Sequence, residues 1–238
     1  MAKNVFKIVA VFIIGVIGGI FADQIFWPYF IERPLFYKYR LEQAPIYVAE
    51  TNEIVIQENS ALQDAVEQVE KTVIGLRTTT AKGTAIEGSG IIVTSDGLII
   101  TLAELVPQDG TSTLFVNGRR SDFQILKRNL ENNLVLIKIE EESLPTVGFA
   151  EFGSLRFGQR VFSVAAVLEK NSLEKMVDEG IIKWYNQEVI QTNISEQDNF
   201  SGSPLFNIKG ELVGLNMVGL EGNVSAISIK GIRGFIGF

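Results

Sequence analysis

One serine near the C-terminus stands in a setting that suits a nucleophile. Ser201 lies in a tight turn with Gly202, directly ahead of an apolar segment typical of a buried strand. A hydroxyl presented in this way reacts with carbonyl groups only when a neighbouring base takes its proton. The 238-residue chain contains no histidine and no cysteine. These absences exclude histidine-dependent triads, imidazole-ligated metals, thiolate nucleophiles and disulfide frameworks.

Charge is distributed unevenly along the chain. The formal net charge is -7, but residues 1–40 carry five basic and two acidic side chains, which leaves 16 basic and 26 acidic ones, or -10, in the remainder. A nucleic-acid-binding body is therefore excluded, because phosphate neutralisation needs a basic face. The three glutamates at 140–142 are typical of a solvated loop. We expect no metal site and no cofactor.

The N-terminal residues predict a membrane-spanning segment. Between residues 5 and 22 only Lys7 is charged, and a helix of that length reaches roughly 27 Å, close to the ~30 Å of a bilayer core. Lys3 and Lys7 precede the apolar run and Asp23 follows it, so the positive-inside rule keeps the N-terminus cytoplasmic. A cleaved signal peptide is the competing interpretation, but bulky Ile20 makes a poor cleavage site. We expect a single-pass cell-membrane protein with an extracytoplasmic body.

The next residues lead from this segment into the body. Residues 31–59 are predicted to form a juxtamembrane tether, in which β-branched residues partly alternate with others. Ser60 and Gln63 have the spacing of a capping box, and apolar residues recur at helical intervals as far as Lys71. This pattern predicts a short amphipathic helix.

From Thr72 onward the pattern changes to short strands separated by turn signals such as Asn117-Gly118 and Lys209-Gly210. Closed antiparallel barrels would remove the edges that so many strands expose. We therefore expect an all-β body of two six-stranded antiparallel barrels, barrel 1 over about 72–143 and barrel 2 over about 150–232, divided near Pro145. The predicted strands are 73–79, 90–94, 98–101, 113–116, 122–127, 134–139, 158–167, 179–184, 188–191, 203–206, 212–217 and 224–229. The expected organisation is an anchor over 1–30, a tether over 31–59 and this domain over 60–238.

Four motifs in order carry a resemblance to a known family. Residues 88–106 read GSGIIVTSDGLIITLAELV and resemble in register GSGVIIS-x-DGYILTNAHVV, the first-barrel signature of the HtrA/Deg family of trypsin-like serine proteases. Residues 132–139 are similar to its TDLAVLKI motif and residues 180–182 to its GIV strand. Residues 190–192 then precede Ser201 at the spacing that the family keeps between its QTD strand and its nucleophile. The resemblance covers roughly residues 60–232, implies a trypsin-like double β-barrel, and leaves no room for the PDZ domain of many relatives.

The resemblance also shows how this chain departs from the family. The catalytic histidine falls on Glu104 and the triad aspartate on Asn133, so only Ser201 keeps its side chain. In subtilisin, loss of the serine or histidine lowers turnover about 10⁶-fold. The oxyanion hole would use the backbone amides of Asn199 and Ser201, with Asn199 in place of a glycine. Asparagine tolerates positive φ, which would preserve the turn but alter amide alignment.

The sequence therefore favours a membrane-anchored pseudoprotease of HtrA type. It would hold a peptide or unfolded protein along the inter-barrel cleft, or associate with an active relative. The alternative is a serine endopeptidase that uses Ser201 with an unorthodox base, either Glu104 or a lysine. A third possibility is an assembly module, because the resemblance implies a homotrimer.

Overall fold

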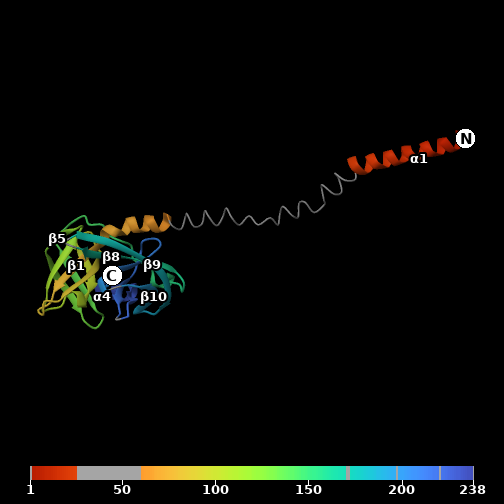
Figure 1. Cartoon of the computed structure of the whole chain (residues 1–238). Coiled ribbons are helices and arrows are strands. Elements are labelled where there is room, and N and C mark those ends of the chain that lie inside the picture. Colours follow the sequence, from red (N-terminus) through yellow and green to blue (C-terminus); the bar gives the residue numbers. More distant parts are fainter. Residues whose placement is uncertain (1, 26–59, 170–171, 197, 220, 238) are drawn as a thin grey trace. The chain divides into compact units, whose positions relative to one another are not determined.

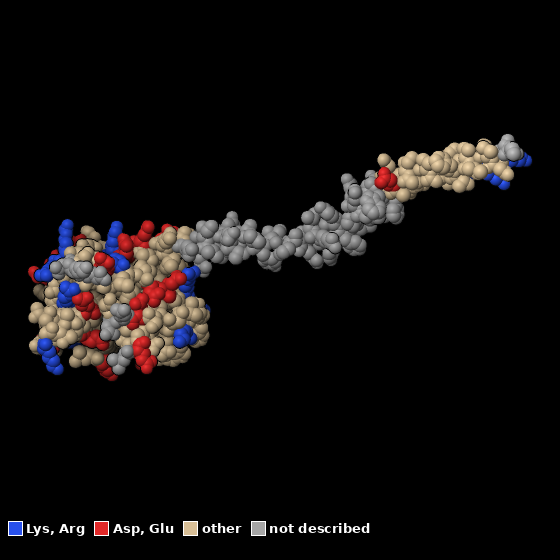
Figure 2. All heavy atoms as spheres, viewed as in Figure 1, with Lys and Arg blue, Asp and Glu red and all other residues tan. Residues whose placement is uncertain are grey.

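The computed structural model describes residues 2–25, 60–169, 172–196, 198–219 and 221–237, so the predicted tether lies outside the described residues. The chain divides into two units, 1–56 and 57–238. The first unit contributes helix α1 (Ala2–Phe21). Between residues 8 and 21 its side chains are apolar and nearly all exposed, a pattern that suits a lipid environment. Basic atoms gather at its N-terminal end and acidic atoms at its other end (Figure 2).

The second unit begins with the predicted helix. Residues 60–69 are α-helical, and the 3-10 turn η2 (Glu70–Thr72) follows. Ser60 is already a helix residue rather than the N-cap that the sequence predicted. The helix buries Ala65 and Val69 in the core. The hydroxyl of Thr72 donates to the carbonyl of Val69 at 2.6 Å, and the chain then enters the first strand.

Seven antiparallel strands form the first sheet, in the order β5-β4-β1-β2-β3-β7-β6. This half is an open sheet, whereas the sequence predicted a closed six-stranded barrel. Asn117 (φ 49) and Gly118 (φ 76) form a hairpin turn that adds the unpredicted β5. The opposite edge, β6, is largely exposed and carries Lys127 and Arg128, charges that protect an unpaired edge. The bounds are β1 (Val73–Thr79), β2 (Ala85–Ile92), β3 (Leu98–Leu102), β4 (Thr111–Val116), β5 (Arg119–Ser121), β6 (Phe123–Asn129) and β7 (Leu134–Ile139).

The second half is the closed six-stranded barrel β10-β13-β12-β11-β8-β9, as predicted. β8 and β9 run together as one long hairpin (Figure 1), paired without interruption from Arg160↔Ile181 to Glu169↔Ser172. Helix α4 (Ile229–Ile236) follows the barrel and was not predicted, because two glycines weaken its helical pattern. The strands are β8 (Arg160–Glu169), β9 (Ser172–Tyr185), β10 (Val189–Ser195), β11 (Pro204–Asn207), β12 (Leu212–Val218) and β13 (Asn223–Ser228).

A shared apolar core joins the two halves. Leu76 of the first sheet, Phe162 and Phe206 of the barrel, and Phe235 of α4 belong to one buried cluster. The rings of Phe162 and Phe206 lie 5.4 Å apart. The predicted fold class, a mostly β trypsin-like body preceded by an apolar helix, is confirmed. Turns from both halves can therefore be held in fixed positions above a common core.

Candidate functional site

Ser201 is held between the two halves by backbone hydrogen bonds. Its carbonyl accepts from the amide of Ser89 in β2 at 2.9 Å. On the barrel side, the amide of Gly202 donates to the carbonyl of Asn216 at 2.8 Å, and the amide of Asn216 donates to the carbonyl of Ser203 at 2.8 Å. Gly202 has φ +76, a left-handed conformation that favours glycine. The turn predicted from the sequence is thus present, and it touches the first sheet directly.

Glu104 and Asn133 meet through the backbone of Glu104. Glu104 lies in the 3-10 turn η3 (Ala103–Leu105), directly after β3. Asn133, with φ 51, lies in the turn between β6 and β7, and asparagine is among the residues that best tolerate this conformation. Its carbonyl accepts from the amide of Ala103 at 3.0 Å, and its side-chain Oδ1 accepts from the amide of Glu104 at 3.0 Å. The two positions that the family resemblance pairs are therefore neighbours in space.

One cleft brings together three of the four predicted site residues. It has a volume of about 540 Å³ and lies between the first sheet and the barrel. Asn133 does not line this cleft; it holds the Glu104 backbone instead. The lining residues are Thr84, Ala85, Ile86, Glu87, Glu104, Leu105, Asn199, Ser201 and Val218. Val218 is not among the predicted site residues, because the strand predicted over 212–217 ends one residue before it.

The serine hydroxyl contacts no base among the residues that the structure describes. Within the described ranges, the hydroxyl of Ser201 makes no hydrogen bond and the exposed carboxylate of Glu104 makes no ion pair. The second carboxylate in the lining, Glu87, is paired with Arg77 at 2.6 Å. No lysine or arginine is among the lining residues that the structure describes. Ser201 and Glu104 thus line the same cleft, but their side chains form no hydrogen bond through which a proton could pass.

Asn199 adopts a conformation that the sequence did not suggest. It lies in the 3-10 turn η5 (Asp198–Phe200), and the described non-glycine residues with positive φ are Asn117, Asn133 and Ser143. The turn therefore persists without the positive φ expected at Asn199, because helical dihedrals suffice for it. The side-chain Oδ1 of Asn199 is buried and has no hydrogen-bond partner among the described atoms.

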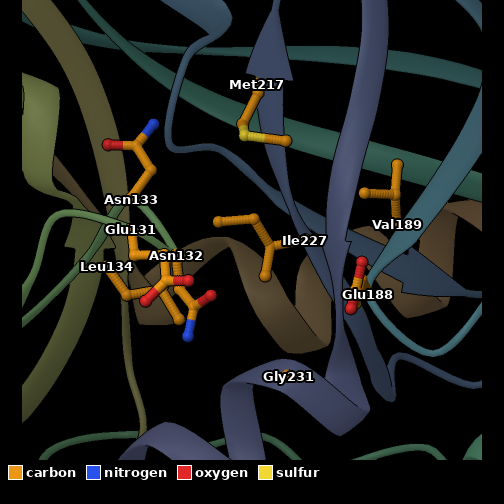
Figure 3. Close-up of a pocket in the computed structure, with 9 residues that line it drawn as sticks. All are labelled: Glu131, Asn132, Asn133, Leu134, Glu188, Val189, Met217, Ile227 and Gly231. Atoms are coloured by element: carbon orange, nitrogen blue, oxygen red, sulfur yellow. The ribbon is translucent and has the colours of Figure 1, made fainter.

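A second cavity of about 380 Å³ lies against the other side of the Asn133 turn. In Figure 3, Glu131 and Asn132 lie on one side, Glu188 and Val189 on the other, and Ile227 between them. Asn133, Leu134, Met217 and Gly231 complete its lining. Glu104, Asn199 and Ser201 are absent from that lining, so this cavity is separate from the cleft. In the part of the chain that the structure describes, no group of three or more acidic side chains is placed to hold a metal ion.

Comparisons with known proteins agree with the fold and the motifs. A family model described as a trypsin-like peptidase domain matches residues 88–215. A probable periplasmic serine endoprotease DegP-like from Halomonas elongata is 31% identical over 140 residues, which are 54% of this chain and 28% of that protein. The corresponding Pseudomonas putida protein is 29% identical over 139 residues, again 54% and 28%. The chain thus spans under a third of the length of these curated relatives.

The solved structures include the HtrA-type protease AlgW with tripeptide. It has a TM-score of 0.62 and 22% sequence identity, and the match covers 70% of this chain and 59% of that one. The resemblance to HtrA/Deg-type proteins is therefore confirmed. The matched family region contains Glu104, Asn133 and Ser201. The chain belongs to the trypsin-like peptidase domain family.

Proposed function

We propose that this protein is a membrane-anchored, HtrA-like pseudoprotease that binds extended peptides in the cleft without cleaving them. The observation that carries the proposal is the Ser201 hydroxyl, which lines the cleft and has no hydrogen-bond partner among the described residues. Glu104 occupies the histidine position and Asn133 the aspartate position. A serine hydroxyl without a base is a very weak nucleophile at neutral pH.

The contact between Asn133 and Glu104 supports this assignment. In a working triad, the third residue orients the side chain of the base, and the base contacts the nucleophile. Here Oδ1 of Asn133 accepts a hydrogen bond from the backbone amide of Glu104, not from its side chain. This contact therefore holds the backbone of Glu104 and does not orient its carboxylate toward Ser201.

The proposed oxyanion hole gives further support. In a 3-10 turn each amide is directed at the carbonyl three residues earlier. Ser201 directly follows such a turn, so its amide is directed along the axis of the turn. The unpartnered Oδ1 of Asn199 adds an acceptor near this place. An acceptor repels a developing oxyanion, whereas an oxyanion hole needs convergent donors.

Peptide binding is supported by the free edge of β12. The amide and carbonyl of Asn216 bond to the Ser201 turn. Val218 lies two residues later, so its amide and carbonyl point to the same edge of β12. β12 pairs with β13 as far as Val218↔Val224, but with β11 only as far as Leu215. An extended peptide can pair with this edge at Val218, which lines the cleft.

The N-terminal helix supports membrane attachment. Lys3–Ile25 is long and apolar enough to cross a bilayer. We assign residues 1–30 as a signal anchor with a cytoplasmic N-terminus, 31–59 as a tether, and 60–238 as an extracytoplasmic domain with barrel 1 over 72–143 and barrel 2 over 150–232. A homotrimer or a complex with an active relative is compatible with this arrangement, and in both the cleft would act by binding.

The rival candidate is a serine endopeptidase that uses Ser201 with an unorthodox base, since Ser201 and Glu104 line one cavity. The test uses the full chain in detergent, labelled casein fragments and a fluorophosphonate probe. We expect the fragments to bind and remain intact, with Ser201 unlabelled. Labelling of Ser201 together with fragment cleavage that disappears in Ser201→Ala would establish the endopeptidase instead.

A further inference from the structure

We infer that the cleft recognises a basic side chain, lysine or arginine, on the peptide that it binds. The inference rests on the proposed function and names the ligand class of the same site. Two residues line this cavity with a side-chain oxygen group that has no described partner: Glu104 with its exposed carboxylate and Ser201 with its hydroxyl. The carboxylate accepts hydrogen bonds only, and the hydroxyl can rotate to accept.

The net charge of the cleft comes from Glu104. Glu87 is neutralised by Arg77, whose guanidinium also donates to the carbonyl of Leu168 at 3.2 Å. That arginine is thus held outside the cleft lining by two contacts. Glu104 is exposed and forms no ion pair in the described ranges. The described lining of the cavity therefore presents one uncompensated negative charge and two groups that can accept hydrogen bonds.

A basic side chain on the peptide would neutralise this charge and donate hydrogen bonds to the acceptors. A lysine ammonium offers three donors and an arginine guanidinium five, and neither accepts. One such group can pair with the Glu104 carboxylate and donate to the hydroxyl of Ser201, which lines the same cavity. An acidic side chain would add acceptors and charge of the wrong sign.

The rest of the lining suits the stem of such a residue. Ala85, Ile86, Leu105 and Val218 supply apolar surface around the polar groups. Lysine and arginine bury their aliphatic stems against surfaces of this kind while the charged head reaches polar partners. The volume of about 540 Å³ leaves room for a long side chain. Because residues 41–238 carry a net charge of -10, basic ligands are also attracted at long range.

The test compares three fluorescent pentapeptides that differ only at the central residue: lysine, norleucine or glutamate. Binding to the full chain in detergent is measured by fluorescence anisotropy at low and moderate salt. We expect the lysine peptide to bind at least about tenfold more tightly than the norleucine peptide at low salt, and the glutamate peptide to bind most weakly. The preference should shrink as salt screens the charge.

Two matched variants locate the recognition. Glu104→Gln keeps the backbone amide that Asn133 holds, so the fold is retained, and it should abolish the lysine preference. Glu131→Gln removes an exposed carboxylate from the other cavity and should leave the preference unchanged. Equal binding of all three peptides would overturn this inference and leave the proposed function standing. No binding of any peptide would overturn the proposed function itself, and a loss confined to Glu131→Gln would place recognition in the other cavity.

Discussion

Gly202 allows a sharp test of the contact that positions Ser201 against the first sheet. A Cβ at residue 202 would lie 2.2 Å from the carbonyl oxygen of Ser89 and 2.7 Å from a methyl group of Leu105. Gly118 has the same φ of +76, but a Cβ there would meet nothing within 4 Å. Gly202→Ala and Gly118→Ala therefore impose the same backbone strain, and only the first forces β2 and the serine turn apart.

The magnitude follows from these contacts. A non-glycine residue in the left-handed region costs roughly 1–2 kcal/mol, which is the whole effect expected for Gly118→Ala. At residue 202 overpacking adds about 1–3 kcal/mol. We expect the 2.9 Å hydrogen bond from the Ser89 amide to the Ser201 carbonyl to break first. We therefore expect Gly202→Ala to lower the free energy of unfolding by about 2–5 kcal/mol in total.

The assay is urea unfolding of the full chain in detergent, followed by tryptophan fluorescence, in which Trp184 reports on the β domain and Trp27, near the N-terminus, adds a background signal. Thermal unfolding gives an independent measure, because each kcal/mol lowers Tm by about 2–4 °C in a domain of this size. Gly202→Ala should also weaken peptide binding, since it displaces Ser201 from the cleft. Equal losses of stability in the two variants would refute the close approach of the serine turn to β2.

Three further predictions concern other parts of the chain. Burial lowers the pKa of Lys175 from 10.5 to about 8, against the opposing charge of Glu70. The unfolded chain therefore binds more protons between about pH 8 and 10.5, and stability should rise with pH there by up to about 3 kcal/mol. Urea titrations at three pH values should find this rise missing in Lys175→Met; an identical slope would contradict the assignment. Asn216→Ala removes the bonds from its Nδ2 to the hydroxyls of Ser163 (2.7 Å) and Ser203 (3.1 Å) and should cost about 1–3 kcal/mol in urea unfolding, so a loss below about 0.5 kcal/mol would count against the network. Ile13→Arg in the middle of α1 costs about 2.5–3.5 kcal/mol of membrane insertion and should release the chain into the soluble fraction on carbonate extraction; full retention would argue against a membrane span.

Local patterns were enough to predict most of the strands. The bounds of β1 and β7 match the prediction, and β3 differs by one residue, because apolar residues in these strands are bounded by strong turn signals. β2 begins five residues earlier than predicted, at Ala85. Glycines at 88 and 90 conceal that strand in the sequence, yet the close approach of the Ser201 carbonyl explains why residue 88 has no side chain.

The sequence by itself determined the all-β class, the apolar N-terminal helix and the absence of a histidine base, since these depend on residue types and short periods. Only the tertiary structure decided that the first sheet stays open and that Asn133 bonds to the amide of Glu104. It also decided that Glu104, Asn199 and Ser201 share one cleft. These features arise from contacts between residues far apart in the chain, and no local period encodes which turns meet when two sheets pack on a common core.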